Sequence, residues 1–380
     1  MSADRDSCNL LVAIARRPAD PPRIRGLAEK VSDWDSLLGL AQEHRLSPML
    51  YLSLADMGPS VPLAAQERLR SEYERNVFHN IASAAELIAV LRMFDRESIS
   101  AMPFKGVVLA SSVYSDMMAR PGGDLDLLIH LHDLPQASSL LLNRGYRLKT
   151  EVRADGVPVD GNYYEYSFES EANGMVLELR WRLELAYGRF GRNLGMDWVW
   201  PHRRTVLLAG AMVPDLKREI ALLILCMHAS KHIWSRLIWI CDVERLLASS
   251  PDLDWEETIR EARRKGLWRC LALGVLLANR VLGAPVPHSV LPRFESDGAA
   301  LRLAEHFEHN LFDMPGVGPS GRVPYNLQLL DFRDRIRLLL TLNLLQPNAR
   351  DRAALSLPGP LKPLYYLLRP FRIFWDRSAR

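Results

Sequence analysis

The sequence predicts an α+β fold, with a small mixed β-sheet flanked by an N-terminal and a C-terminal helical region. Apolar residues recur with a period near 3.6 from Ser32 to about Ser98, which is typical of helices. A period of two then takes over as far as about Pro214, and helical spacing returns after it. We expect a chain of 380 residues to form more than one domain, with these boundaries: an N-terminal helical region over 1–98, a sheet-containing core over 99–215, a C-terminal helical domain over 216–345 and a tail over 346–380.

In the N-terminal region, the segment WDSLLGLAQEHRL predicts one helix. Pro62 opens a second helical segment that keeps its apolar spacing for about thirty residues. A helix of this length is expected to brace the following core, with its charged residues forming a solvated face.

The core is predicted to alternate short strands and short helices. Its segments are a strand AMPFK, a helix VVLASSVYSD, a strand DLDLLIH, a helix LPQASSLLLNRGY, and two strands NYYEYSFES and GMVLELRWRL. The turn between the last two strands is predicted at Asn173-Gly174. We expect one more strand, TVLLAGAMVP, to close the same sheet.

After Pro214 the chain is predicted to be helical, in segments LKREIALLILCMHASKHIW, IWICDVERLLAS and DWEETIREARRKGLWRCLALGVLLANRVL. Asp254 is a predicted N-cap, because acidic residues follow it in the first turn. Residues 285–325 are rich in Pro and Gly and predict a loop. The tail mixes prolines, aromatic residues and arginines, so it is predicted to pack against its own domain, to lie on a membrane surface or to bind a partner.

Composition indicates a soluble globular protein of the cytoplasm. The N-terminus lacks the pattern of a signal peptide, and the longest apolar run, Ile220–Met227, is too short to span a bilayer. The cysteines form no Cys-x-x-Cys pair and lie mostly among apolar residues, which predicts buried thiols rather than disulfides or structural zinc; they are Cys8, Cys226, Cys241 and Cys270. The net charge is only +3, which argues against long nucleic acid as a partner.

Two carboxylates mark the candidate site. Asp124 and Asp126 lie two residues apart at the start of an apolar strand, so they share one face with Cα atoms about 7 Å apart. Two like charges beside a buried strand repel each other and lose hydration, unless a cation offsets that cost. Mg²⁺ is the expected ion, with Mn²⁺ as an alternative, because it prefers oxygen ligands and substrate phosphates.

Metal-dependent phosphoryl chemistry usually needs a third carboxylate, and Glu178 is the candidate. It lies on the polar face of the strand MVLELRW, and we expect this strand to be the antiparallel neighbour of the Asp strand. The alternative is an ordinary outward-facing glutamate. Three other carboxylates nearby compete for the same role: Glu165, Glu169 and Glu184.

The motifs resemble the bacterial proteins grouped as uncharacterised nucleotidyltransferases, within the DNA polymerase β-like nucleotidyltransferase superfamily. The resemblance covers residues 30 to 285 approximately and is most specific over 102–130. It rests on Lys105-Gly106, Tyr114, Arg120, the Gly-Asp-Leu-Asp-Leu-Leu-Ile string, the later Leu-Glu-Leu-Arg-Trp and the helical His-x-x-Lys-His. It implies a nucleotidyltransferase core flanked by helices, whose acidic triad is Asp124, Asp126 and Glu178.

The resemblance also implies a reaction: a nucleoside monophosphate passes from a nucleoside triphosphate to a hydroxyl or phosphate acceptor, and pyrophosphate leaves. The three carboxylates would hold two Mg²⁺ ions. The superfamily's Gly-Ser phosphate-binding turn maps onto Lys105-Gly106, although Val107 replaces the serine, and Lys105 is expected to supply charge instead. Arg120 is expected to clamp a triphosphate oxygen.

A polar stripe in the C-terminal region adds further candidates. His228, Lys231, His232 and Ser235 follow helical spacing. Three interpretations remain open: contact with nucleotide phosphates or the acceptor, a zinc site, and a purely structural stripe. Asp242 is expected to orient Lys231 or to cap a turn.

Other functions stay open. A glycosyltransferase also binds its metal and nucleotide sugar through an Asp-x-Asp, but it needs a parallel sheet upstream, where this sequence is helical. A non-catalytic module for binding a nucleotide or a partner is the other alternative. The acceptor is expected to be a small molecule, a peptide or a protein side chain, and the sequence does not choose the nucleotide base.

Overall fold

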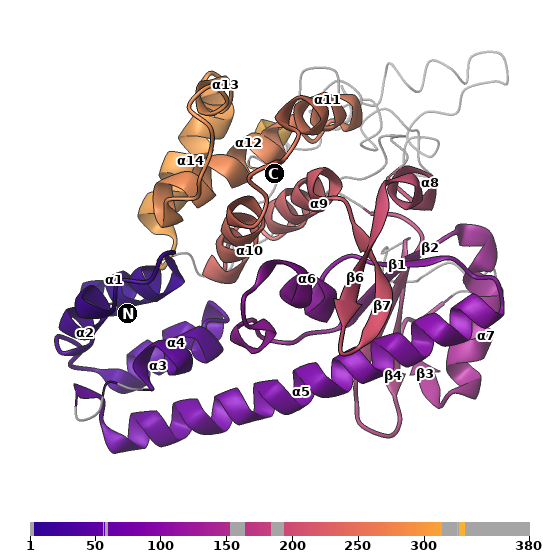
Figure 1. The fold of residues 1–380 in the computed structure, drawn as a ribbon, viewed down its shortest axis with the longest axis horizontal. Coiled ribbons are helices and arrows are strands. Elements are labelled where there is room, and N and C mark those ends of the chain that lie inside the picture. Colours follow the sequence, from indigo (N-terminus) through magenta and orange to yellow (C-terminus); the bar gives the residue numbers. More distant parts are fainter. Residues whose placement is uncertain are drawn as a thin grey trace, which may run out of the picture.

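The computed structural model describes residues 4–55, 57, 60–152, 164–183, 194–313, 325 and 327–330. A five-stranded mixed sheet lies beside one long helix, and shorter helices pack at the other side of the molecule (Figure 1). The chain therefore has the predicted α+β architecture. Predictions for the tail over 346–380 and for Glu184 lie outside the described residues.

Five helices precede the sheet: α1 Arg5–Ala15, α2 Pro21–Ala28, α3 Trp34–Glu43, α4 Ser47–Leu54 and α5 Leu63–Arg96. The first three begin in the same way, because Asp4, Asp20 and Asp33 each accept the backbone N–H three residues further on. Pro62 directly precedes α5, whose 34 residues confirm the prediction of one long helix.

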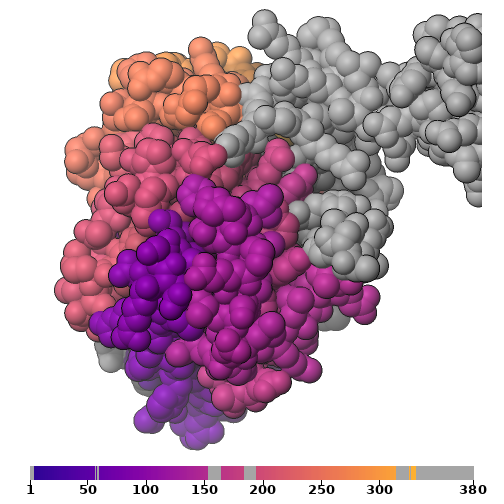
Figure 2. All heavy atoms as spheres, turned by 90° about the vertical axis from the view of Figure 1, so that its right-hand side faces the viewer, coloured from indigo at the N-terminus to yellow at the C-terminus, as the bar shows by residue number. Residues whose placement is uncertain are grey.

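Helix α5 runs along the edge of the molecule opposite the C-terminal helices (Figures 1 and 2). Among the described helices, it is the one long and apolar enough, by length and composition alone, to cross a membrane, over a window of 18 residues. In this fold 44% of that apolar window is buried. Its buried residues include Leu87, Val90 and Phe94, which pack against the sheet.

The sheet has the strand order β1-β2-β5-β4-β3, with β1 Ala101–Pro103, β2 Leu125–Ile129, β3 Tyr146–Leu148, β4 Glu165–Ser170 and β5 Val176–Arg180. Strands β2 and β5 are parallel, and the other pairs are antiparallel. The expected antiparallel pairing of β5 with the Asp strand was therefore wrong. A parallel neighbour needs a crossover, which α7 and the β3–β4 hairpin provide.

The two faces of the sheet differ. Helix α5 and helix α7, Leu134–Asn143, cover one face, where Leu127 and Leu177 are fully buried. The other face carries Asp126 and Glu178, because side chains alternate along each strand. Helix α6, Gly106–Val113, connects β1 to the loop before β2, and this loop contains the short helix η2, Met117–Ala119.

The segment after β5 differs from the prediction. After α8, Met196–Val199, and η4, Trp200–His202, the chain forms a separate antiparallel hairpin of β6, Arg203–Leu208, and β7, Ala211–Leu216. The sequence analysis treated this stretch as one strand of the main sheet. Ala209 and Gly210 both have positive φ angles and turn the chain in the middle of it.

The C-terminal helices are α9 Arg218–Lys231, α10 Leu237–Ala248, α11 Trp255–Lys265, α12 Trp268–Leu277 with a π-helical end Ala278–Leu282, α13 Leu291–Glu295 and α14 Gly298–Asn310. Asp254 caps α11 as predicted. The loop predicted over 285–325 was wrong, because α13 and α14 lie within it. Pro292 sits in the first turn of α13, and the Asp297 side chain caps α14.

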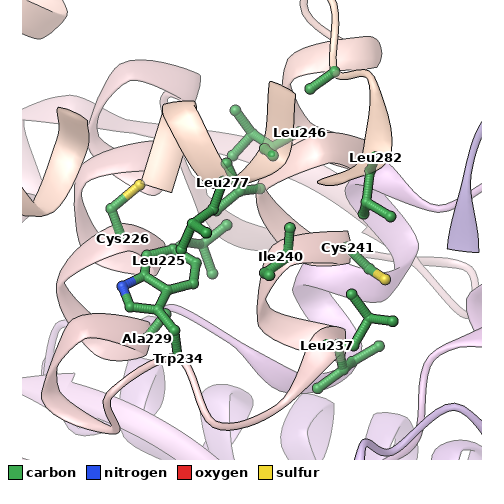
Figure 3. Packing of buried hydrophobic residues seen from close by; sticks show 14 of the residues in the cluster. Leu225, Cys226, Ala229, Trp234, Leu237, Ile240, Cys241, Leu246, Leu277 and Leu282 are labelled. Carbon is green, nitrogen blue, oxygen red and sulfur yellow. The ribbon is translucent and has the colours of Figure 1, made fainter. Parts of the chain in front are cut away.

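Helices α9, α10 and α12 pack around one apolar core. Figure 3 shows Trp234 between Leu225, Cys226 and Ala229, with Leu237 and Ile240 of α10 nearby. Trp234 is completely buried, and its indole N–H donates to Ser230 Oγ. Gly274 of α12 lies against Cys226, since a Cβ there would come within 2.4 Å of its sulfur. This close packing fixes the helices that face the sheet.

Candidate active site

Two carboxylates of the sheet lie directly opposite each other. Asp126 on β2 and Glu178 on β5 are register partners in the parallel pair, so both side chains leave the same face. The hydrophobic residues on either side, Leu125 and Leu177 among them, are buried on the opposite face. The alternation that each strand requires therefore brings two like charges together.

Two basic side chains offset that repulsion. Lys105 Nζ lies 2.8 Å from Asp126 Oδ1, and Arg180 Nε lies 3.6 Å from the same oxygen. Arg180 also ion-pairs with Glu178 and, at 2.7 Å, with Glu165. Burial alone would raise the pKa of Asp126, but Lys105 and Arg180 outweigh burial and lower it.

The pKa of Glu178 is shifted in the opposite direction. Burial, followed by the negative charge of Asp126, raises its pKa to about 7, although Arg180 acts against the shift. The pair therefore shares a site in which the pKa of one carboxylate is lowered and the other carboxyl is half protonated near neutral pH. Perturbed pKa values of this kind are common at functional sites.

Asp124 directly precedes β2 and is the most exposed of the three predicted ligands. Burial and the neighbouring Asp126 raise its pKa. In the part of the chain that the structure describes, no group of three His, Cys, Asp or Glu side chains is arranged to hold a metal ion. The oxygen donors suit Mg²⁺ chemically, but Lys105 and Arg180 neutralise them here.

The predicted phosphate-binding turn lies beside these carboxylates. Lys105 is the N-cap of α6, and Gly106 begins the helix with a φ of +64°, a conformation that favours glycine. Both residues line the same cavity as Asp126. A helix N-terminus with a neighbouring lysine suits an anionic group.

The guanidinium of Arg120, predicted to clamp a triphosphate oxygen, pairs with a carboxylate of helix α10 in this structure. Its Nε and Nη2 atoms donate to the two carboxylate oxygens of Asp242 at 2.8 and 2.9 Å. Tyr114 donates its hydroxyl to the same carboxylate at 2.7 Å. Asp242 lies inside helix α10 rather than at a turn, and its carboxylate anchors the loop before Asp124 to that helix.

Helix α5 holds the same loop from the other side. The Asn80 side chain donates to the carbonyls of Met117 and Arg120, and Asn76 accepts from the Gly122 N–H at 2.9 Å. Gly122 has no room for a side chain, since a Cβ would come within 2.4 Å of Asn80 Oδ1. The role of these asparagines was not predicted, because the polar side of α5 was expected to be only a solvated face.

The His-x-x-Lys-His stripe faces the carboxylates from the helical side of the cavity. His228 and His232 pack against Trp239 of α10, with ring centroids 5.8 and 5.3 Å away. Burial, and then nearby positive charges, lower the pKa of both histidines, to about 4 for His232. Both are therefore neutral at pH 7, so they offer hydrogen bonds rather than charge.

All nine predicted site residues line one cavity of about 410 Å³: Lys105, Gly106, Arg120, Asp124, Asp126, Glu178, His228, Lys231 and His232. Of the competing glutamates, Glu165 lines it too, whereas Glu169 pairs with Arg147 and Lys149 outside it. A larger cleft of about 670 Å³ lies between α5, β1 and the β6–β7 hairpin, but its charged lining residues are only Arg92 and Asp95.

The cavity is also lined by Ser235 of the predicted polar stripe and by residues that were not predicted as site residues, among them Arg45, Arg180, Arg236 and Trp239. Arg180 carried a sequence signal, because it is two residues from Glu178 on the same strand face. Arg45 and Arg236 carried none, since they lie at helix corners that meet only in the folded chain.

A family model described as "Uncharacterised nucleotidyltransferase" matches residues 30–283. No curated protein matches the chain. Among solved structures, the crystal structure of the lincosamide antibiotic adenylyltransferase LnuA, lincomycin-bound, is similar with 15% sequence identity and a TM-score of 0.32, covering 43% of this chain and 94% of that one.

Proposed function

Since the chain belongs to the family of uncharacterised nucleotidyltransferases, we propose that it transfers a nucleoside monophosphate from a nucleoside triphosphate to a hydroxyl or phosphate acceptor. The observation that carries the proposal is the juxtaposition of Asp126 and Glu178 beside Lys105 in one polar cavity. This arrangement combines ligands for a divalent cation with a basic group for phosphates.

Asp124, Asp126 and Glu178 would hold Mg²⁺, or Mn²⁺ in its place. When bound, the metal would neutralise phosphate charge and lower the pKa of the acceptor hydroxyl. The fit rests on the donor set: hard carboxylate oxygens, of which Glu178 has a pKa raised to about 7 by burial and by Asp126. A carboxylate in that state gains from a nearby cation, because the cation favours its charged form.

The protein's own residues would position the reaction. Lys105 would move from Asp126 to the triphosphate, and the N-terminus of α6 at Gly106 would bind a phosphate oxygen. The acceptor oxygen would bond to the α-phosphorus as the α–β bridging P–O bond breaks. Pyrophosphate would leave, and the acceptor proton would pass to Glu178 or water. His228, His232 and Lys231 would contact the nucleotide from the helical side.

The acceptor would be a small molecule or a peptide or protein side chain in the cytoplasm. A glycosyltransferase of the Asp-x-Asp type is less well supported, because the described residues upstream of β1 form helices α1–α5 rather than a parallel sheet. The purified protein, supplied with each nucleoside triphosphate, Mg²⁺ or Mn²⁺ and pooled small-molecule or peptide acceptors, is expected to release pyrophosphate and to label one acceptor with a nucleotide mass. Release from no combination would contradict transferase activity and favour a binding module.

A further inference from the structure

Two short links between helices, which we call corners, meet at the rim of the cavity. Both contain residues with positive φ angles. Arg45, between α3 and α4, has a φ of 57°, and Ile233 and Trp234, between α9 and α10, have φ values of 57° and 49°. Positive φ is costly for a β-branched residue such as Ile233. The first corner carries Arg45 and the second leads to Arg236, and both arginines line the cavity.

His44 joins the two corners. Its Nδ1 accepts the Leu237 N–H at 3.1 Å, and its carbonyl accepts the Ile238 N–H at 3.3 Å. The side chain is almost completely buried, and burial lowers its pKa to about 4. His44 therefore stays neutral at pH 7 and keeps the ring nitrogen that accepts this bond. This contact joins the two corners, and the neighbouring residues Arg45 and Arg236 both line the cavity.

The charges at this junction are not balanced. Lys105, Arg120 and Arg180 each ion-pair with a carboxylate of the cavity or of α10. Among the described residues, Arg45 and Arg236 form no ion pair: Arg45 donates to the Gly122 carbonyl, and Arg236 lies 5.6 Å from the Trp239 ring. Burial, followed by the positive charges of Arg120 and Arg236, lowers the pKa of Arg45, while Asp242 and Asp124 act against this shift.

We propose that Arg45 and Arg236 form an anion subsite that binds a phosphate group on the helical side of the cavity, across from Asp126 and Glu178. Guanidinium groups suit this role because they donate several hydrogen bonds in fixed geometry to phosphate. The first amides of α10 are already bonded to His44, so the side chains provide the recognition. The identity of the molecule that carries the phosphate rests on the proposed function, but anion binding itself does not.

The subsite is tested by calorimetric titration of the full-length protein with inorganic phosphate and with tripolyphosphate. Arg236→Gln is expected to weaken binding of at least one of these anions by about tenfold, because one of two guanidinium partners is lost. Arg70→Gln is the matched control, since Arg70 is an exposed arginine on α5 whose ion-pair partner among the described residues is Glu74. Thermal melts of both variants check folding. Equal affinities in wild type and Arg236→Gln would overturn the proposal.

A competition titration identifies which substrate carries the phosphate. If inorganic phosphate still binds in an Arg236-dependent way when tripolyphosphate is saturating, the subsite belongs to the acceptor. If tripolyphosphate excludes it, the subsite belongs to the nucleotide tail. Neither titration requires turnover, so Arg236-dependent binding without pyrophosphate release from any nucleotide would refute the proposed function and leave the subsite standing. Normal pyrophosphate release, together with anion binding that does not depend on Arg236, would support the proposed function and overturn the subsite.

Discussion

The Lys105 ammonium lies 2.8 Å from the Asp126 carboxylate, and the two side chains are only 11% and 7% exposed. The lysine comes from the start of α6 and the aspartate from β2, so the helix supplies the charge that the strand needs. The apposed carboxylates can therefore coexist without a metal. Under the proposed function, a nucleotide that competes for Lys105 would leave Asp126 available to a divalent cation.

Asp126→Asn is expected to abolish pyrophosphate release, because the variant keeps the shape of the side chain but loses its negative charge. Lys105 would then lack its carboxylate partner, at a cost on the order of 1–3 kcal/mol in the free energy of unfolding. Glu169→Gln is the control, since Glu169 is a carboxylate of the same sheet outside the cavity. Enzymatic pyrophosphate detection and urea denaturation provide the measurements. Wild-type turnover by Asp126→Asn would remove the residue from the mechanism.

The raised pKa of Glu178 predicts that the stability of the fold depends on pH. Its pKa is about 7 in the folded protein against an ordinary value of 4.5. Between these values the unfolded chain has released the proton that the folded protein still holds, so stability falls as pH rises from 4.5 to 7. Glu178→Gln cannot titrate and should lose less stability over this range. Melting temperatures of both proteins from pH 5 to 8 test this, and parallel profiles would refute it.

Asp242 is expected to be structurally essential. Its carboxylate is 2% exposed and binds both Arg120 and Tyr114, so Asp242→Ala would leave a buried guanidinium and a buried hydroxyl without this partner. The expected loss is about 3–5 kcal/mol of unfolding free energy, measured in urea. The exposed Arg70–Glu74 pair provides the contrast, because Glu74→Gln should cost about 1 kcal/mol or less. Similar small losses from both variants would contradict the anchoring role of Asp242.

Two adjacent glycines offer a matched test of the loop before Asp124. A Cβ on Gly122 would lie 2.2 Å from His79 and 2.4 Å from Asn80, whereas one on Gly123 would meet Arg45 at 3.5 Å, an ordinary contact. Gly122→Ala should therefore cost roughly 1–3 kcal/mol and slow turnover, because Asn80 cannot move without losing its bonds to the loop.

Gly123→Ala is the control and should stay close to wild type in both assays. Neither glycine has a positive φ angle, so the comparison isolates the steric effect. Equal melting temperatures for the two variants would show that α5 does not clamp this loop.

Local patterns in the sequence were enough to predict the elements and the faces of the strands. The alternation of polar and apolar residues placed Glu178 and Leu177 on opposite faces of the same strand. Helical spacing identified the length of α5. The direction of pairing was not predictable in this way. Strand β5 is equally amphipathic in either direction, and only the crossover through α7 decides that β2 and β5 run parallel.

Contacts between distant residues explain the remaining differences. The pairing of Arg120 with Asp242 was not predictable, because the two residues are 122 positions apart. Arg45 and Arg236 were missed for the same reason, since His44 and Leu237 are separated by 193 positions. The loop predicted over 285–325 failed for a local reason: Pro292 lies in a first helical turn, where proline is tolerated.

The crossover between β2 and β5 has a consequence for synthesis. Asp126 emerges from the ribosome well before Glu178, and the two cannot meet until α7 and the β3–β4 hairpin have folded between them. A nascent or truncated chain that stops short of Arg180 would carry an incomplete and unbalanced acidic site. Under the proposed function, such fragments are expected to bind neither cation nor nucleotide.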